Sequence, residues 1–345
     1  MKRRTLMKSV AAAALALGLV PGIAAAQEVT LRLHQFLPPP APVPAHILKP
    51  WAERIEARTD GKLKIEHYDA MALGGRPPDL MDQAIDGVAD IIMTVVGYNP
   101  GRFPKTEVFE LPFMMTSPVA TSKAFQELVE TELQDGEYSN VKVLGAWVHG
   151  PGMIHSKSPI TKLEDMEGKK LRGPTRVISD MLGELGATPV GMPLPAIPEA
   201  MSKGVIDATV IPWEVTAAIR LSELVDHHVE FSGDESLYTA TIITVMNREK
   251  YDSLPEDIRE AIDAESGMAL SEFAAQVMWD YDKPARDQAV EAGNTIVKLD
   301  ADEVARWKAK AEPVIDRWVA DMESKGIDGR ALIEQAKELI VKHGG

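Results

Sequence analysis

Apolar and polar positions follow two rhythms along the chain. Some short segments are apolar throughout or at every second position, which is typical of β-strands. Longer segments between them carry apolar residues three and four positions apart, which is typical of amphipathic helices. Strands are predicted at residues 29–36, 62–69, 90–98, 141–150, 169–172, 208–211 and 240–246, with a further short strand just before the proline-rich turn at 193–198. Strands interleaved with helices predict an α/β protein with mostly parallel strand pairing.

Two helices have recognisable signals. Ser117 followed by Pro118 predicts a helix start, because serine caps helices and proline fits the first helical position. A second helical run follows Pro255 and continues for about 35 residues by its pattern, with Pro284 expected to kink it. A helix of this length is uncommon in a compact α/β domain, and one natural use is to span two domains.

The first 26 residues are predicted to be a secretory signal peptide. A basic segment, MKRRTLMKS, precedes a short apolar stretch, and small residues up to Ala26 form a cleavage site before Gln27. The Arg3-Arg4 pair also resembles a twin-arginine signal, so both export routes stay open. The mature protein is expected to be soluble and periplasmic.

The composition and the missing motifs exclude several classes of function. The formal net charge of −15 argues against a nucleic-acid partner, and the absence of cysteine excludes disulfides, thiol nucleophiles and zinc–thiolate sites. The chain lacks a nucleophile elbow, a phosphate-binding loop, a dinucleotide fingerprint and a zinc-protease motif. The carboxylates are expected on solvated helix faces, and the adjacent His227 and His228 diverge in any regular element. We therefore expect a binding protein without metal or cofactor, rather than an enzyme.

Several motifs then carry a family resemblance. In order along the chain they are ALGG at 72–75, MDQAIDGVADI at 81–91, TEVFELPFM at 106–114, LEDMEGKKLRGP at 163–174, MLGELGATPVGMPLPAIPEAMSKGVIDA at 181–208 and YDSLPEDIREAI at 251–262. In combination they resemble the DctP-type solute-binding proteins of tripartite ATP-independent periplasmic (TRAP) transporters. The resemblance implies a periplasmic binding protein fold, with two α/β lobes closing on a ligand, mixed and mainly parallel sheets, and a long helix spanning both lobes.

The resemblance also implies how the chain is divided into lobes and which membrane proteins receive its ligand. Lobe I is expected to contain residues 27–150 and about 239–278, and lobe II residues 151–238 and about 279–345. A monomer would deliver its ligand to the small and large membrane subunits of a TRAP permease. A sensor subunit that signals without transport is the alternative; an exported hydrolase finds no motif to support it.

Arg172 is the central candidate for ligand binding. In the family that the chain resembles, the arginine ending a Lys-Leu-Arg strand pairs with the substrate carboxylate. A planar guanidinium suits this task because it offers two parallel donors to a carboxylate. The alternative for Arg172 is a surface salt bridge with Asp180 or Glu184. Arg176, one turn into the next helix, is expected to face solvent.

The rest of the pocket is expected to be more aromatic and less polar than in many relatives. Segment 210–214 reads VIPWE where many relatives carry an asparagine, and HGPGM at 149–153 lacks the second arginine of sialic-acid binders. The ligand hypothesis is an aromatic monocarboxylate such as a benzoate or hydroxybenzoate. A short 2-oxo or 2-hydroxy acid, a dicarboxylate, a sugar acid and a betaine remain alternatives. Besides Arg172, the expected site residues, each with core packing as its alternative, are Trp213, Trp147, Tyr98, His149, Gln35, Tyr238 and Met153.

Overall fold

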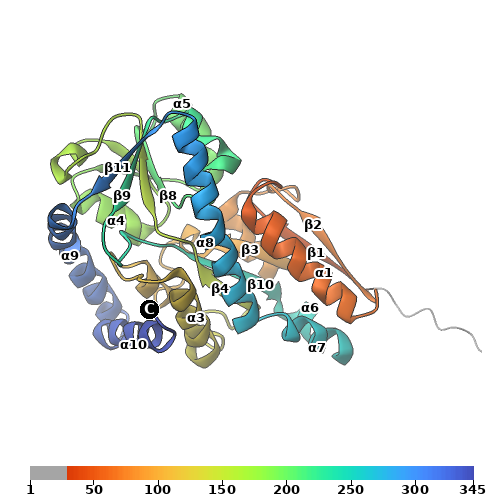
Figure 1. Cartoon of the computed structure of the whole chain (residues 1–345). Helices are drawn as coiled ribbons and strands as arrows, with labels where there is room; N and C mark the ends of the chain where they lie inside the picture. The colour runs from red at the N-terminus through yellow and green to blue at the C-terminus, as the bar shows by residue number, and fades with distance from the viewer. Residues whose placement is uncertain (1–28) are drawn as a thin grey trace, which may run out of the picture.

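The computed structural model of the protein describes residues 29–345, so the expected signal peptide lies outside the described residues. Two β-sheets lie side by side, each covered by helices (Figure 1). None of the helices in the described range combines the length and hydrophobicity needed to cross a bilayer. The first sheet has the order β2-β1-β3-β10-β4, formed by β1 (Val29–Gln35), β2 (Leu63–Tyr68), β3 (Ile91–Val95), β4 (Val141–Val148) and β10 (Thr241–Asn247).

The second sheet contains the strands that sequence patterning predicts least well. Its order is β11-β9-β5-β8-β6-β7. The strands β5, β9 and β11 were not predicted, because they are short and carry polar residues. The six strands are β5 (Met153–Ser156), β6 (Lys170–Gly173), β7 (Thr188–Gly191), β8 (Ala208–Ile211), β9 (His227–Phe231) and β11 (Thr295–Leu299).

Both sheets are mixed, and five of the nine strand pairs among the described residues are parallel: two of four in the first sheet and three of five in the second. Within the described residues, parallel pairs join β1 to β2 and β3, β6 to β7 and β8, and β9 to β11. The antiparallel pairs involve β10, between β3 and β4, and β5, between β8 and β9. The chain passes between the sheets after β4 and again after β9. Thr241 lies opposite Val148, so the two crossing segments run next to each other.

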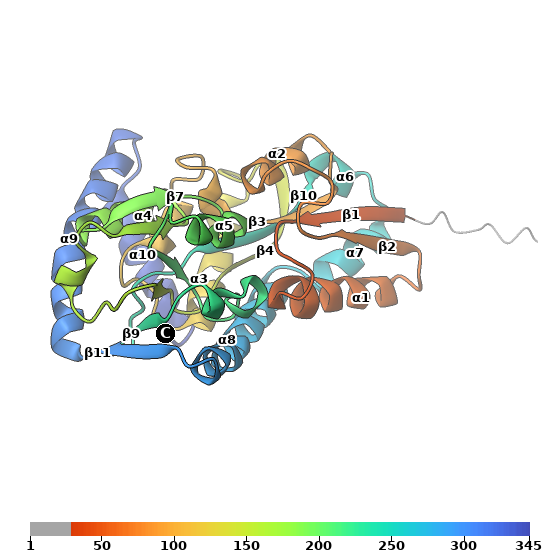
Figure 2. The same cartoon turned by 90° about the horizontal axis from the view of Figure 1, so that it is seen from above.

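The predicted long helix is two helices. α7 (Glu256–Ala264) ends before α8 (Met268–Glu291), so the expectation of one continuous helix is wrong. Gly267 interrupts the run because its φ of 63° is left-handed, and its N–H bonds the carbonyl of Leu144 instead. α8 still spans both lobes: it packs on β4 of the first sheet, and its second half packs against Trp213 of the second (Figures 1 and 2).

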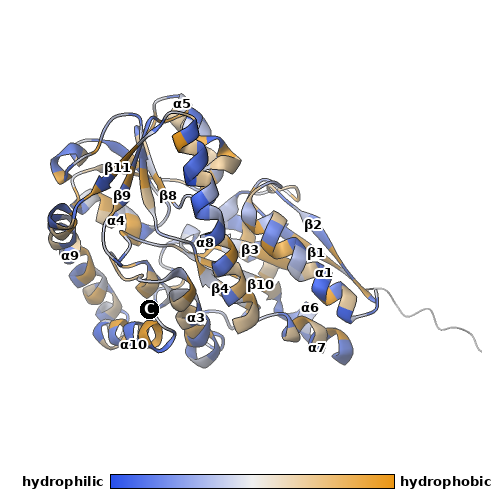
Figure 3. Cartoon of the chain, viewed as in Figure 1, coloured by the Kyte–Doolittle hydropathy of each residue, from blue (hydrophilic) through white to orange (hydrophobic). Residues whose placement is uncertain are grey.

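The remaining helices cover the sheets. The capped start at Ser117 is confirmed, since its side chain accepts the N–H of Ala120. In Figure 3, α9 and α10 show alternating hydrophobic and hydrophilic stretches, as expected for half-buried helices. The bounds are α1 (Lys49–Arg58), α2 (Leu80–Ile85), α3 (Pro118–Leu128), α4 (Arg176–Glu184), α5 (Ile197–Ser202), α6 (Arg248–Asp252), α9 (Ala301–Ser324) and α10 (Gly329–Lys342).

The C-terminal helices connect the two lobes once more, after the two crossing segments and α8. α9 packs on α4 beside the second sheet, whereas α10 returns to pack on α3 beside the first. The expected assignment of all of 279–345 to lobe II therefore does not describe α10. The other lobe boundaries stay a prediction.

Candidate functional site

The two crossing segments are tied together by His149. Its Nε2 accepts the N–H of Ala240 at 3.0 Å, and its Nδ1 lies 2.5 Å from the carbonyl oxygen of Gly150. This pattern assigns the proton to Nδ1 and makes the imidazole neutral. Burial, with a smaller effect from the charge of Arg172, lowers the pKa of His149 to about 4. Both ring nitrogens are thus committed to the crossing, and neither is free for the hydrogen bond to ligand expected of them.

Arg172 lies at the end of β6 with its side chain buried. Only 2 % of the residue is exposed. Its Nε donates to the carbonyl of Met192 at 2.8 Å and its Nη1 to the carbonyl of Val210 at 3.0 Å. Nη2 makes no hydrogen bond with any described residue. Burial lowers the pKa of Arg172, although an arginine stays charged in proteins.

No described carboxylate forms a salt bridge with Arg172. The alternative pairing with Glu184 is wrong, because that carboxylate pairs with Lys310 and Arg317. A buried charge that only neutral carbonyls solvate is unfavourable unless an opposite charge joins it. The position therefore favours an anion.

Two tyrosines flank the guanidinium. Tyr98 extends from the turn after β3, and its hydroxyl oxygen accepts the N–H of Leu194 at 3.0 Å. Tyr238 comes from the second crossing segment; it is buried, and its hydroxyl has no hydrogen-bond partner among the described residues. Burial raises the pKa of both phenols, against a smaller lowering effect of the Arg172 charge. Both therefore stay protonated and able to donate.

Gly152 makes the close approach of Tyr238 possible. A Cβ at Gly152 would lie 2.0 Å from Cε1 of the Tyr238 ring, which no side chain allows. The N–H of Gly152 also bonds the carbonyl of Tyr238 at 3.0 Å, and the ring meets His149 edge-on at 5.4 Å. The two crossings thus place Tyr238 next to Arg172.

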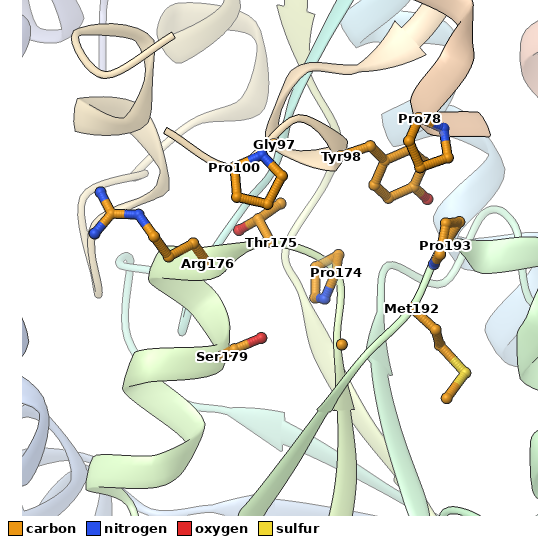
Figure 4. A pocket seen from close by; sticks show the side chains of 11 residues that line it. Pro78, Gly97, Tyr98, Pro100, Pro174, Thr175, Arg176, Ser179, Met192 and Pro193 are labelled. Carbon is orange, nitrogen blue, oxygen red and sulfur yellow. The ribbon is translucent and has the colours of Figure 1, made fainter. Parts of the chain in front are cut away.

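A pocket of about 280 Å³ opens between the lobes beside these residues (Figure 4). Figure 4 shows Tyr98 with its hydroxyl directed toward the segment of Pro193, and Met192 in the loop that follows β7. Arg172 itself does not line the pocket, but Tyr98 and Met192 belong both to the pocket wall and to the surroundings of the arginine. The pocket is lined by Pro78, Gly97, Tyr98, Pro100, Pro174, Thr175, Arg176, Ser179, Gly191, Met192 and Pro193.

Further contacts hold the lobes together at the rim of this pocket. Arg176 forms an ion pair with Glu107 of the first lobe and a second with Asp321 of α9, at 3.0 Å. The expectation that Arg176 faces solvent is wrong, because α4 begins at the lobe boundary. Trp318 donates its indole N–H to the same Glu107 at 3.2 Å.

Gln35 has a structural environment. Its amide nitrogen donates to Leu37 and Asp69, at 2.8 and 2.9 Å, and its amide oxygen accepts the N–H of Leu37. All of these contacts organise the loop after β1. A ligand role for Gln35 stays a prediction that these contacts do not favour.

Trp213 and Met153 lie in a hydrophobic cluster with Ala285 and Ala289 of α8. The indole N–H of Trp213 donates to Glu230 at 3.2 Å. These contacts favour a packing role for both residues. Trp147 differs: it is fully buried in β4, and its indole N–H finds no partner in the described part of the chain.

Three buried carboxyl groups near the lobe boundary were not anticipated. Glu110 accepts the N–H and hydroxyl of Thr241 at 3.0 and 2.8 Å, and burial raises its pKa to about 7. Asp282 of α8 accepts the N–H of Glu214 at 2.9 Å, and burial raises its pKa to about 7 as well. Burial, with Asp282 as the second cause, raises the pKa of Glu214. The expectation that carboxylates lie on solvated helix faces fails here; the weak signal was that Glu110 and Glu214 each interrupt an apolar segment.

Comparisons with known proteins agree with this architecture. The family profile described as bacterial extracellular solute-binding protein, family 7 (DctP) matches residues 35–321. A marine metagenome TRAP solute-binding protein in complex with 3-hydroxybenzoate is 46% identical, with a TM-score of 0.90 over 92% of this chain and 100% of that one. A TRAP solute-binding protein from Rhodoferax ferrireducens with copurified benzoate is also 46% identical, with a TM-score of 0.90 over 91% and 98%.

A more distant relative matches almost the whole length of the chain. The protein named outer membrane transporter protein TsaT, from Comamonas testosteroni, is 27% identical over 91% of this chain and 93% of its own length. The family profile, the two-sheet fold and these relatives agree along most of the described chain. The chain belongs to the DctP family, family 7 of the bacterial extracellular solute-binding proteins.

Proposed function

We propose that this protein captures an aromatic monocarboxylate, of the benzoate or hydroxybenzoate class, and delivers it to the membrane subunits of a TRAP permease. The observation that carries the proposal is the buried guanidinium of Arg172, which has no carboxylate partner in the described chain. The two relatives at 46% identity, described with benzoate and with 3-hydroxybenzoate, support the ligand class.

The chemistry of the proposed site is reversible binding. A carboxylate would accept two hydrogen bonds from the free edge of the Arg172 guanidinium, in the planar arrangement that lysine cannot reproduce. Tyr98, Tyr238 and Trp147 would supply aromatic surface and buried donors around the ring. Such a pocket combines apolar walls with a few placed polar groups.

The lobes would close over the ligand by moving at the crossing segments. Closure is stabilised by contacts that exist only when both lobes touch the ligand. We propose that the hinges are 150–152, 238–240 and the part of α8 near 278–284. We also propose that the protein works as an exported periplasmic monomer, with residues 1–26 removed, and that it has no catalytic activity.

A thermal-shift screen of residues 27–345 tests the ligand class. The panel contains benzoates, aryl-acetates, 2-oxo acids, dicarboxylates, sugar acids and betaines. A ligand that binds only the native state stabilises it by mass action and so raises Tm. At a free ligand concentration of one hundred times Kd, the free energy of unfolding rises by about 2.7 kcal/mol. We expect a large shift with aromatic monocarboxylates and a small one with the other classes. A large shift confined to another class would contradict the proposed ligand.

The permease partner needs a separate experiment. Vesicles containing the small and large subunits of a TRAP permease should take up labelled benzoate only when this protein is present. Binding without stimulated uptake would favour the sensor role.

A further inference from the structure

Tyr98 joins three parts of the proposed site. It belongs to the first lobe, and its hydroxyl oxygen accepts the backbone N–H of Leu194 in the second lobe at 3.0 Å. The same hydroxyl lies beside the guanidinium of Arg172. The phenol therefore links the lobes at the point where the uncompensated charge lies.

The proton of the Tyr98 phenol has no acceptor among the described residues. An amide N–H and a guanidinium can only donate, so neither Leu194 nor Arg172 can accept the proton of the phenol. Burial raises the pKa of Tyr98, so the phenol keeps its proton. Within residues 29–345, no hydrogen bond uses this O–H as donor. A buried donor without an acceptor is unfavourable, and a carboxylate held by Arg172 would supply one.

Tyr238 offers a natural comparison. It too is buried beside the guanidinium, and its hydroxyl is unpaired among the described residues. Its ring, however, is fixed by the crossing segments through Gly152 and His149, and its hydroxyl makes no hydrogen bond between the lobes. The two phenols face the same charge but differ in their connection to the opposite lobe.

We infer that Tyr98 is the residue that makes closure depend on the ligand's carboxylate. The inference rests on the proposed function and concerns how that site is regulated. With a carboxylate present, the phenol donates to the anion while it accepts from Leu194, so one hydroxyl group completes both the ligand contact and the contact between lobes. Without the anion, closure buries an unsatisfied O–H and an unsatisfied guanidinium together, which disfavours the closed state.

The absence of cysteine allows a direct test. Val88 and Val205 are exposed, at 45% and 48%, and lie in different lobes. Val88→Cys and Val205→Cys, labelled with a fluorescent donor and acceptor, report closure by energy transfer. Benzoate is titrated into this labelled protein, alone and with Tyr98→Phe or Tyr238→Phe.

Tyr98→Phe is expected to bind benzoate at least tenfold more weakly, to release it faster, and to reach a smaller change in energy transfer even at saturation. Tyr238→Phe is expected to bind more weakly but to reach the full change. Leu194→Pro removes the N–H from the other side while leaving the phenol, and it is expected to reduce the amplitude as Tyr98→Phe does. The extended backbone of Pro193, with ψ of 155°, is compatible with a following proline.

A full change in energy transfer in Tyr98→Phe at saturating benzoate would overturn the inference, whatever happens to Kd. An equal reduction of amplitude in Tyr238→Phe would overturn it too, because the effect would not depend on the bond between lobes. Failure of the unsubstituted labelled protein to bind benzoate would instead contradict the proposed function, so the two failures are distinguishable.

Discussion

The imidazole of His149 accepts the backbone N–H of Ala240 at 3.0 Å, and this bond joins the two segments through which the chain passes between its lobes. The hydroxyl of Thr239 reinforces the junction by donating to the His149 carbonyl at 2.8 Å. The residue that the sequence suggested as a ligand donor is thus a structural element of the crossing. Its effect on binding would be indirect, through the position of Tyr238.

This junction predicts a loss of stability in acid. The pKa of His149 is lowered from 6.5 to about 4, so between these values the unfolded chain binds a proton that the folded chain does not. The stability is fully present above pH 6.5 and is lost as pH falls through 4. By about 1.36 kcal/mol per pKa unit, the whole effect is on the order of 3 kcal/mol.

Chemical denaturation of the protein and of His149→Gln between pH 7 and pH 4 measures this contribution. We expect His149→Gln to be less stable at pH 7 and to lose less stability on acidification. Parallel pH profiles in the two proteins would contradict the assignment of the neutral imidazole.

Glu110 predicts the opposite dependence near neutrality. Its pKa is raised from 4.5 to about 7, so the folded chain binds the extra proton. The stability from this group is fully present below pH 4.5 and is lost as pH rises through 7. Thr241 donates to the carboxyl and Thr175 lies beside it, and both favour its ionised form, while Glu107 opposes its ionisation.

The Glu110→Gln substitution keeps the shape of the side chain and removes its titratable carboxyl group. We expect its free energy of unfolding to fall less between pH 5.5 and pH 8 than that of the unsubstituted protein, by about 2 kcal/mol, because only the roughly 1.5 pH units up to the folded pKa contribute in this range. Asp282→Asn is a matched comparison, since burial raises the pKa of Asp282 to about 7 as well. A Glu110→Gln profile as steep as the original would show that Glu110 is ionised when buried.

Substitution of Trp213 tests whether this side chain packs in the core or contacts the ligand. Its indole packs on Ala285 and Ala289, so Trp213→Ala is expected to cost about 3–5 kcal/mol of stability by opening a cavity. The ratio of affinities for benzoate and a short aliphatic acid should change little. Trp147→Phe is the matched variant, and we expect it to lower that ratio with a smaller loss of stability. A selective loss of benzoate affinity in Trp213→Ala would contradict the packing role and show that Trp213 contacts the ligand.

Sequence reasoning predicted the parts of the fold that depend on local patterns. Alternating and continuously apolar segments predicted the strands of the first sheet, the Lys-Leu-Arg motif predicted Arg172 at a strand end, and the Ser117 cap predicted the start of α3. The break at Gly267 carried only a weak signal, because a single glycine inside a helical pattern is often tolerated. Strand β5 has four residues and follows Gly150-Pro151-Gly152, which leaves too little pattern for prediction.

The sequence could not predict which neighbours surround each residue of the site. Trp213 and Tyr238 are both buried aromatic residues near the lobe boundary. The indole N–H of Trp213 donates to Glu230, whereas the hydroxyl of Tyr238 has no hydrogen-bond partner in the described chain. The buried carboxyl of Glu110 differs from a solvated glutamate only by its neighbours Thr241 and Thr175, which are distant in sequence.

The most direct test of the central claim is a calorimetric titration of benzoate into the protein, Arg172→Lys and Arg172→Ala. The account predicts tight binding by the unsubstituted protein and a loss of at least a hundredfold in both variants, about 2.7 kcal/mol or more, with circular dichroism unchanged. Lysine keeps the charge but lacks the planar pair of donors, so it should not rescue binding. Affinity within a few-fold of the original in both folded variants would show that Arg172 does not hold the carboxylate.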